Sequence, residues 1–208
     1  MRSRLRLLVA ALTGALAALV VAPLLGEGDA RAFCRTTNNE SFAPTAAKPC
    51  DDVGAPIAWP SKCVGYSFQT NGSVQVDLAT ARALARKAFD DWSSLDCATC
   101  PGMGAGNPSI SFVEQGTVAC NKAEYNPSAG NANVITFWDH DWPHPDGDIT
   151  LALTTVTYSR STGDIYDADL EVNSDRSINE LTTADPPAKV SYDLPSIFAH
   201  EIGHFFGL

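Results

Sequence analysis

Two histidines and a glutamate near the end of the chain constrain its fold and chemistry more than any other feature. His200 and His204 are four residues apart, so on a helix both side chains lie on one face, about a turn from each other. Two imidazoles placed in this way can bind one metal ion, and the neighbouring Glu201 can take a proton from a water molecule that the metal activates. The spacing therefore predicts a helical Zn²⁺ site with His200 and His204 as ligands and Glu201 as general base.

The glycine that follows extends this pattern. Gly207 comes three residues after His204, and glycine allows a sharp turn that ends the helix and sends the chain back towards the metal. The stretch HEIGHFFGL, residues 200–208, resembles the metzincin zinc proteases and is closest to the matrixin branch, whose motif reads HExxHxxGxxH. The resemblance implies a third histidine ligand three residues after Gly207, beyond Leu208. It therefore implies a matrixin-like metallopeptidase domain that is incomplete at its C-terminus.

The first 32 residues have the features of a signal peptide. Three arginines precede an apolar run over residues 7–25, and residues 30–32 (Ala-Arg-Ala) have the small-x-small form of a cleavage site. A membrane anchor is the alternative, but Gly14 and Pro23 interrupt the run. We therefore expect a secreted protein, extracellular or periplasmic, with no membrane association after cleavage.

The charge of the chain argues against some classes of partner. Residues 1–32 contain four of the 14 basic and two of the 24 acidic residues, so the remainder has 10 basic and 22 acidic residues, a net charge of −12. Such an acidic protein is a poor candidate for binding nucleic acid. The chain also contains no Gly-rich phosphate loop and no GxSxG element, so nucleotide binding and serine hydrolysis have no support.

All the cysteines follow the predicted cleavage site. An even number of cysteines in an exported chain indicates disulfides, although six cysteines allow about 15 pairings. A redox or zinc pair is the alternative for the CxxC at Cys97 and Cys100. The six are Cys34, Cys50, Cys63, Cys97, Cys100 and Cys120.

We expect three parts in this chain. Residues 1–32 form the signal peptide and residues 33–60 a disulfide-pinned N-terminal segment, and the resemblance implies that residues 61–208 form a matrixin-like metallopeptidase domain. Apolar alternation predicts strands and a 3.6-residue period predicts helices. The expected elements are a strand from Val64 through Phe68, a helix over 78–95 capped by Asp77 and containing a core Trp92, strands over 110–114, 134–138, 149–158 and 165–173, and a final helix capped by Asp193 with Pro195 in its first turn.

This order of elements predicts an α+β fold with a twisted, mixed, mostly parallel sheet, a long backing helix and a C-terminal zinc-binding helix. The resemblance implies the N-terminal subdomain of the zincin-like, metzincin fold. In the matrixin order, residues 149–158 would be the edge strand that lines the cleft and pairs with a substrate peptide. A plain interior strand is the alternative.

Two acidic regions carry alternative interpretations. Residues 139–148 contain four Asp together with His140 and His144, and the matrixins hold structural ions in the loop at this point. The same residue types also make ordinary turns, and the family arrangement puts this loop on the far side of the sheet from the zinc helix. In residues 165–173, period-two alternation places Asp167, Asp169 and Glu171 on one face of a strand. The resemblance to the matrixins implies that these carboxylates help to bind Ca²⁺. The alternative is that they lie on a solvated face of the strand.

Taken together, these patterns predict a secreted, monomeric zinc-dependent metalloendopeptidase that acts on protein or peptide substrates. Two alternatives remain open, and in both of them the protein does not cleave peptides. One is a catalytically inert truncated metzincin, and the other is a secreted disulfide-rich binding domain with weak zinc affinity. A gluzincin-type protease would need a downstream Glu ligand, and Gly207 favours the metzincin interpretation.

Overall fold

The computed structural model describes residues 35–43, 45, 48, 50–51, 53–95, 109–183 and 192–208. The predicted signal peptide, the start of the N-terminal segment and three of the cysteines (Cys34, Cys97 and Cys100) lie outside these residues. The elements are, in chain order, β1 Cys63–Gln69, α1 Leu78–Ser93, β2 Ser111–Val118, β3 Asn133–Trp138, β4 Ala152–Tyr158, β5 Ile165–Asn173, β6 Leu181–Thr182, β7 Tyr192–Asp193 and α2 Leu194–Phe205.

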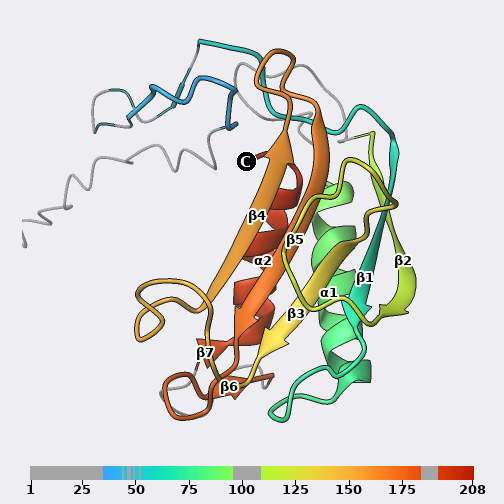
Figure 1. The fold of residues 1–208 in the computed structure, drawn as a ribbon, viewed down its shortest axis with the longest axis vertical. Coiled ribbons are helices and arrows are strands. Elements are labelled where there is room, and N and C mark those ends of the chain that lie inside the picture. Colours follow the sequence, from blue (N-terminus) through green and yellow to red (C-terminus); the bar gives the residue numbers. More distant parts are fainter. Residues whose placement is uncertain are drawn as a thin grey trace, which may run out of the picture. The chain divides into compact units, whose positions relative to one another are not determined.

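Five strands form one mixed sheet in the order β2-β1-β3-β5-β4 (Figure 1). β1 is parallel to β2 and β3, β3 is parallel to β5, and β4 alone is antiparallel to its neighbour. β6 and β7 form a separate two-stranded parallel sheet. The predicted α+β fold with a mixed, mostly parallel sheet is confirmed. β4 is an edge strand, so that prediction is also confirmed and the alternative of an interior strand is wrong.

Both helices begin where the sequence predicts. Asp77 caps α1 by accepting a hydrogen bond from the Thr80 N–H, and Asp193 caps α2 in the same way from Ser196. Pro195 is accommodated in the first turn of α2. An N–H group at this position would have no intrahelical partner, so the proline costs the helix no hydrogen bond. The helices pack against each other and cover one face of the sheet (Figure 1).

The core between the sheet and the helices contains a cluster of aromatic rings. The Phe89 ring of α1 stacks on Tyr66 of β1 at 4.3 Å and meets Phe205 of α2 edge-on at 5.3 Å. Trp92 is partly buried against this cluster, as predicted. The aromatic contacts therefore join β1, α1 and α2 into one unit.

The strand boundaries differ from the prediction at two places. β2 continues to Val118 because Gly116, with a φ of +95°, allows a bulge at which two residues of β2 lie opposite one of β1. β4 begins at Ala152 because residues 146–150 form a turn, in which the N–H groups of Ile149 and Thr150 donate to the Asp146 oxygen.

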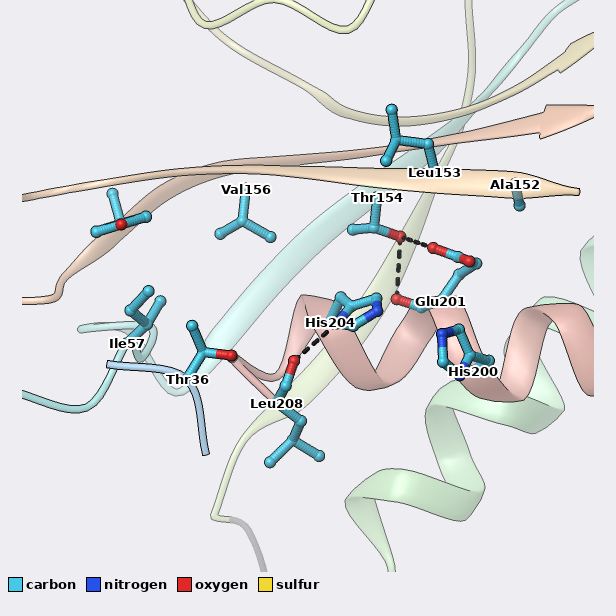
Figure 2. Close-up of a pocket in the computed structure, with 12 residues that line it drawn as sticks. Thr36, Ile57, Ala152, Leu153, Thr154, Val156, His200, Glu201, His204 and Leu208 are labelled. Atoms are coloured by element: carbon cyan, nitrogen blue, oxygen red, sulfur yellow. Dashed lines mark hydrogen bonds between the residues drawn. The ribbon is translucent and has the colours of Figure 1, made fainter. Parts of the chain in front are cut away.

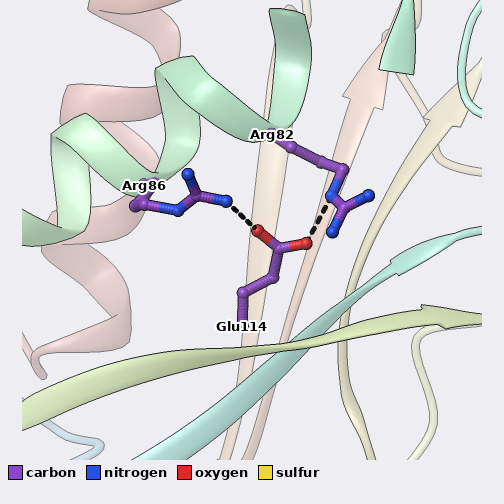
Figure 3. Close-up of polar contacts among 3 residues, drawn as sticks. All are labelled: Arg82, Arg86 and Glu114. Carbon is purple, nitrogen blue, oxygen red and sulfur yellow. Dashed lines mark hydrogen bonds and ion pairs between the residues drawn. The ribbon is translucent and has the colours of Figure 1, made fainter. Parts of the chain in front are cut away.

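A carboxylate on β2 ties that strand to α1. Glu114 accepts hydrogen bonds from Arg82 and from Arg86, the latter at 2.8 Å (Figure 3). The Glu114 side chain is 7% exposed, whereas the two arginine side chains are 37% and 57% exposed. The pair of guanidiniums is therefore what neutralises this nearly buried charge.

The acidic face of β5 is buried, so the interpretation of a solvated strand face is wrong. Asp167, Asp169 and Glu171 are each 2–3% exposed. The loops on either side of β3, residues 119–132 and 139–150, cover this face: Asp169 accepts from the main chain of Glu124, and Glu171 bonds to His144 at 2.7 Å. Long-range packing of this kind cannot be read from alternation along one strand.

Tyr166 also departs from the simple alternation of β5. It is 48% exposed, although Ala168, two residues further on the same face, is fully buried. The pairing with β4 shifts register next to Tyr166, which frees its ring to stack on Tyr125 at 5.8 Å.

The cysteines in the described residues do not all share one state. Cys50 is disulfide-bonded, whereas Cys63 and Cys120 have exposed free thiols. Cys63 is in register with the first residue of β2, and Cys120 follows the end of that strand. The length of β2 therefore separates the two thiols, which do not pair with each other.

Candidate functional site

The last two turns of α2 bring His200 and His204 together, as the sequence predicts. Their ring centres lie 5.0 Å apart with the ring planes perpendicular. His200 is exposed and His204 is half-buried, so neither ring is sealed in the core. The opposite side of the helix, which includes Phe198 and Ile202, is buried and holds α2 against the sheet.

Both imidazoles line a cavity of about 360 Å³ between α2 and the edge strand β4 (Figure 2). β4 contributes one wall of this cavity, and the turn after α2 and the N-terminal segment contribute another. The lining residues are Thr36, Ile57, Ala152, Leu153, Thr154, Val156, Tyr158, His200, Glu201, His204, Gly207 and Leu208. The site is therefore assembled from segments that are far apart in the sequence.

A hydrogen bond to the main chain fixes the tautomer of His204. Its Nδ1 lies 2.7 Å from the main-chain oxygen of Leu208 (Figure 2). A carbonyl oxygen can only accept, so Nδ1 must carry the proton, and in the neutral ring Nε2 keeps its lone pair. Imidazoles that bind metals are commonly held by such a bond on the other nitrogen.

Glu201 follows His200 on the helix, and its carboxylate is oriented by β4. The side chain is 8% exposed and lines the cavity. The Thr154 hydroxyl lies 2.8 Å from Glu201 Oε2 and 3.1 Å from the main-chain oxygen of Glu201. No motif marks Thr154 in the sequence, and only the pairing of the sheet shows that it reaches the site.

The turn predicted at Gly207 is confirmed. Gly207 has a φ of +82° and follows the last helical residues, where its N–H donates to the His204 oxygen at 2.9 Å. The Thr36 N–H then donates to the Gly207 oxygen at 2.9 Å. The N-terminal segment therefore holds the end of the helix that carries both histidines, a role that the sequence did not reveal.

Two tryptophans set the position of α2 against the rest of the core. Trp92 Nε1 donates to the Ala199 oxygen at 2.7 Å, and Trp59 Nε1 donates to the Phe205 oxygen at 2.5 Å. Gly203 lies close to the Trp92 ring, which a Cβ would approach at 3.1 Å. These contacts fix the position of the helix along its own axis. They thereby fix the positions of His200 and His204 relative to β4.

The acidic loop over residues 139–148, one of whose two predicted roles is to bind an ion, is held by internal hydrogen bonds. Asp139 accepts from the Ser73 and Ser174 hydroxyls, each at 2.7 Å. His140 pairs with Asp141 at the surface, and His144 pairs with Glu171 on the sheet face opposite α2. These two histidines therefore lie away from the cavity between α2 and β4.

No group of three or more His, Cys, Asp or Glu side chains in the described part of the chain is arranged to hold a metal ion. His200 and His204 are thus a two-donor arrangement here.

The acidic side chains of β5 form a different kind of cluster: burial raises the pKa of Asp169 to about 8 and that of Asp167 to about 6. One Asp167 oxygen, Oδ1, is buried without a hydrogen-bond partner.

No protein-family profile matches the chain, and no curated protein sequence matches it. Neither described helix has the length and apolar character needed to cross a membrane.

Proposed function

We propose that this protein is a secreted zinc-dependent metalloendopeptidase related to the matrixins. The observation that carries the proposal is the arrangement of His200, Glu201 and His204. Two imidazoles one helical turn apart and a carboxylate line one solvent-accessible cavity beside an edge strand. The mixed sheet, its edge strand and the glycine turn after the helix agree with the resemblance of residues 200–208 to the HExxHxxG motif.

The distance between the two imidazoles fits a shared zinc ion. Zinc binds imidazole nitrogen at about 2.0–2.1 Å in tetrahedral geometry, which places the centres of two bound rings about 5 Å apart. The observed separation is 5.0 Å. His204 also presents the lone pair of Nε2, because its Nδ1 donates to Leu208. The proposal requires a third donor, which the resemblance places three positions after Gly207.

Glu201 would move the proton in the reaction. When bound, zinc supplies Lewis-acid chemistry, polarising the scissile carbonyl and acidifying water. Glu201 takes a proton from the water whose oxygen attacks the carbonyl carbon, and it then gives that proton to the leaving amine as the C–N bond breaks. The cavity wall beside β4 shields this exchange from bulk solvent on one side.

The proposed substrate class is an extended peptide. β4 is hydrogen-bonded to β5 along one edge only, and its other edge can accept a further strand. Five of its residues line the same cavity as the histidines: Ala152, Leu153, Thr154, Val156 and Tyr158. A peptide that pairs with β4 would therefore pass its backbone directly over His200 and His204.

The test combines zinc binding and peptide cleavage in the purified full chain. Glu201→Gln should keep zinc affinity within about threefold and lower the cleavage of a fluorogenic casein substrate by at least about 10³-fold, since the base is lost. His204→Ala should lose zinc binding. His140→Ala is the matched control, because this exposed histidine pairs with Asp141 away from the cavity and should change neither quantity. Full activity in Glu201→Gln would refute the assignment.

A catalytically inert zinc-binding domain is the second candidate. The observation in its favour is the two-donor arrangement, since a catalytic zinc site usually has three protein ligands and a structural site four. Zinc titration distinguishes the two. Tight binding together with casein cleavage supports the peptidase, whereas weak binding without cleavage supports the inert domain.

A further inference from the structure

Thr154 is the one residue in the described structure that donates a hydrogen bond to the Glu201 carboxylate. Its hydroxyl lies 2.8 Å from Oε2 and 3.1 Å from the main-chain oxygen of the same residue (Figure 2). A hydroxyl has a single proton, so it satisfies one of these acceptors at a time. The shorter distance and the charge of the carboxylate favour Oε2.

The geometry of β4 explains why this threonine reaches the helix. Side chains alternate along a strand, so Ala152, Thr154 and Val156 share the face that lines the cavity. Thr155, the next residue, points to the other face and is exposed. The strand therefore presents two adjacent threonines in opposite environments, of which one contacts Glu201.

We propose that Thr154 is a positioning residue for Glu201, an assignment that rests on the proposed function. Its hydroxyl holds Oε2 against β4 and leaves the other oxygen, Oε1, to take the proton of the attacking water. Glutamate has three side-chain torsions, and without a fixed partner its carboxylate would sample several rotamers. A displacement of about 1 Å in a reacting group can lower a rate by up to about 10²-fold.

The same hydrogen bonds link the edge strand to the helix of the site. Because Thr154 contacts both the carboxylate and the main chain of Glu201, any shift of β4 relative to α2 changes the position of the base. A peptide that pairs with β4 would therefore bind to the strand that orients the catalytic carboxylate. The substrate-binding edge and the base are thus joined through one side chain.

Replacement of the hydroxyl by a methyl group tests this role. Thr154→Val keeps the β-branched shape and should lower kcat for a peptide substrate by about 10-fold to 100-fold, with KM and zinc affinity within about twofold of the parent. Thr154→Ser, which retains the hydroxyl, should restore kcat to within about threefold. Thr155→Val is the matched control on the exposed face and should leave kcat unchanged. Equal kcat in Thr154→Val and the parent would overturn the proposal.

A second measurement does not depend on activity. In a crystal structure of metal-free Thr154→Val, the Glu201 carboxylate should leave the position it occupies beside β4, whereas in Thr154→Ser it should stay. If Thr154→Val does not fold, Thr154→Ala serves for both measurements. An unmoved carboxylate would refute the positioning role even if the parent chain cleaved peptides. A parent chain that binds zinc but cleaves nothing would refute the proposed function instead.

Discussion

Gly207 lies directly against the main-chain oxygen of Ile57. A Cβ built on Gly207 would be 2.2 Å from that oxygen, and the residue has a φ of +82°. The Ile57 N–H in turn donates to the Thr36 oxygen, and the Thr36 N–H donates to the Gly207 oxygen, each at 2.9 Å. The end of the helix that carries the two histidines is therefore held by the N-terminal segment through main-chain contacts.

Gly207→Ala should destabilise the protein by roughly 2–3 kcal/mol. The methyl group would both clash with the Ile57 main chain and require an L-residue to adopt a left-handed conformation. Urea unfolding followed by circular dichroism measures the change. Gly130→Ala is the control, because a Cβ there meets no atom within 4 Å. Equal stability of the two variants would contradict the contact described.

Asp193→Ala should lower stability by about 1 kcal/mol, because α2 loses the side chain that caps its first turn. Asp193 accepts from the Ser196 N–H at 2.9 Å and from the Ser196 hydroxyl. Asp193→Asn retains a capping oxygen and should recover most of the loss. Thermal unfolding of the three proteins checks the order, and an Asn variant as unstable as the Ala variant would rule out capping as the cause.

The Glu114 cluster should respond asymmetrically to substitution. Glu114→Gln leaves two guanidiniums that are already partly hydrated, so it should lower the free energy of unfolding by only about 1 kcal/mol. The double change Arg82→Met and Arg86→Met keeps the apolar stems but leaves a nearly buried carboxylate unpaired. This loss should exceed about 2 kcal/mol. Urea titrations compare the two, and a larger effect of Glu114→Gln would be inconsistent with the burial seen here.

The buried acidic pair on β5 should make the protein less stable as the pH rises. Burial raises the folded-state pKa of Asp169 to about 8 and that of Asp167 to about 6, above the value of about 3.9 expected in the unfolded chain. Between about pH 4 and pH 8 the folded state retains protons that the unfolded chain has released. The free energy of unfolding therefore falls over this range and levels off above it.

Asp169→Asn should remove the upper part of this pH dependence. The amide oxygen can still accept from the Val134 N–H, and no charge is buried at position 169 at high pH. We expect the variant to be more stable than the parent at pH 8, with a smaller difference at pH 5. Urea midpoints at the two pH values test this, with the exposed Asp148→Asn as control. A variant that is less stable than the parent at pH 8 would show that the raised pKa has been misassigned.

Local patterns predicted most of the fold. The caps at Asp77 and Asp193, the glycine turn at Gly207 and the strand from Val64 through Phe68 depend on neighbouring residues, and the structure confirms each of them. The order of strands and helices also placed β4 at the edge of the sheet, because the resemblance supplied that order. These features required no knowledge of long-range contacts.

The environment of the acidic side chains could not be predicted in this way. Alternation showed that Asp167, Asp169 and Glu171 share a face, but a solvated face and a covered face have the same sequence pattern. Residues 119–132 and 139–150 cover this face in the folded chain, and the register shift beside Tyr166 exposes that ring. Burial of this kind depends on segments that are distant in the sequence.

The sequence by itself determined that His200 and His204 lie on one face of a helix with Glu201 beside them, because helical periodicity is a local property of the backbone. Only the tertiary structure decided that Thr154 reaches the Glu201 carboxylate and that Thr36 and Ile57 hold the end of the helix. Those contacts join residues 47 or more positions apart. Their geometry follows from strand pairing and core packing, which no spacing within a motif encodes.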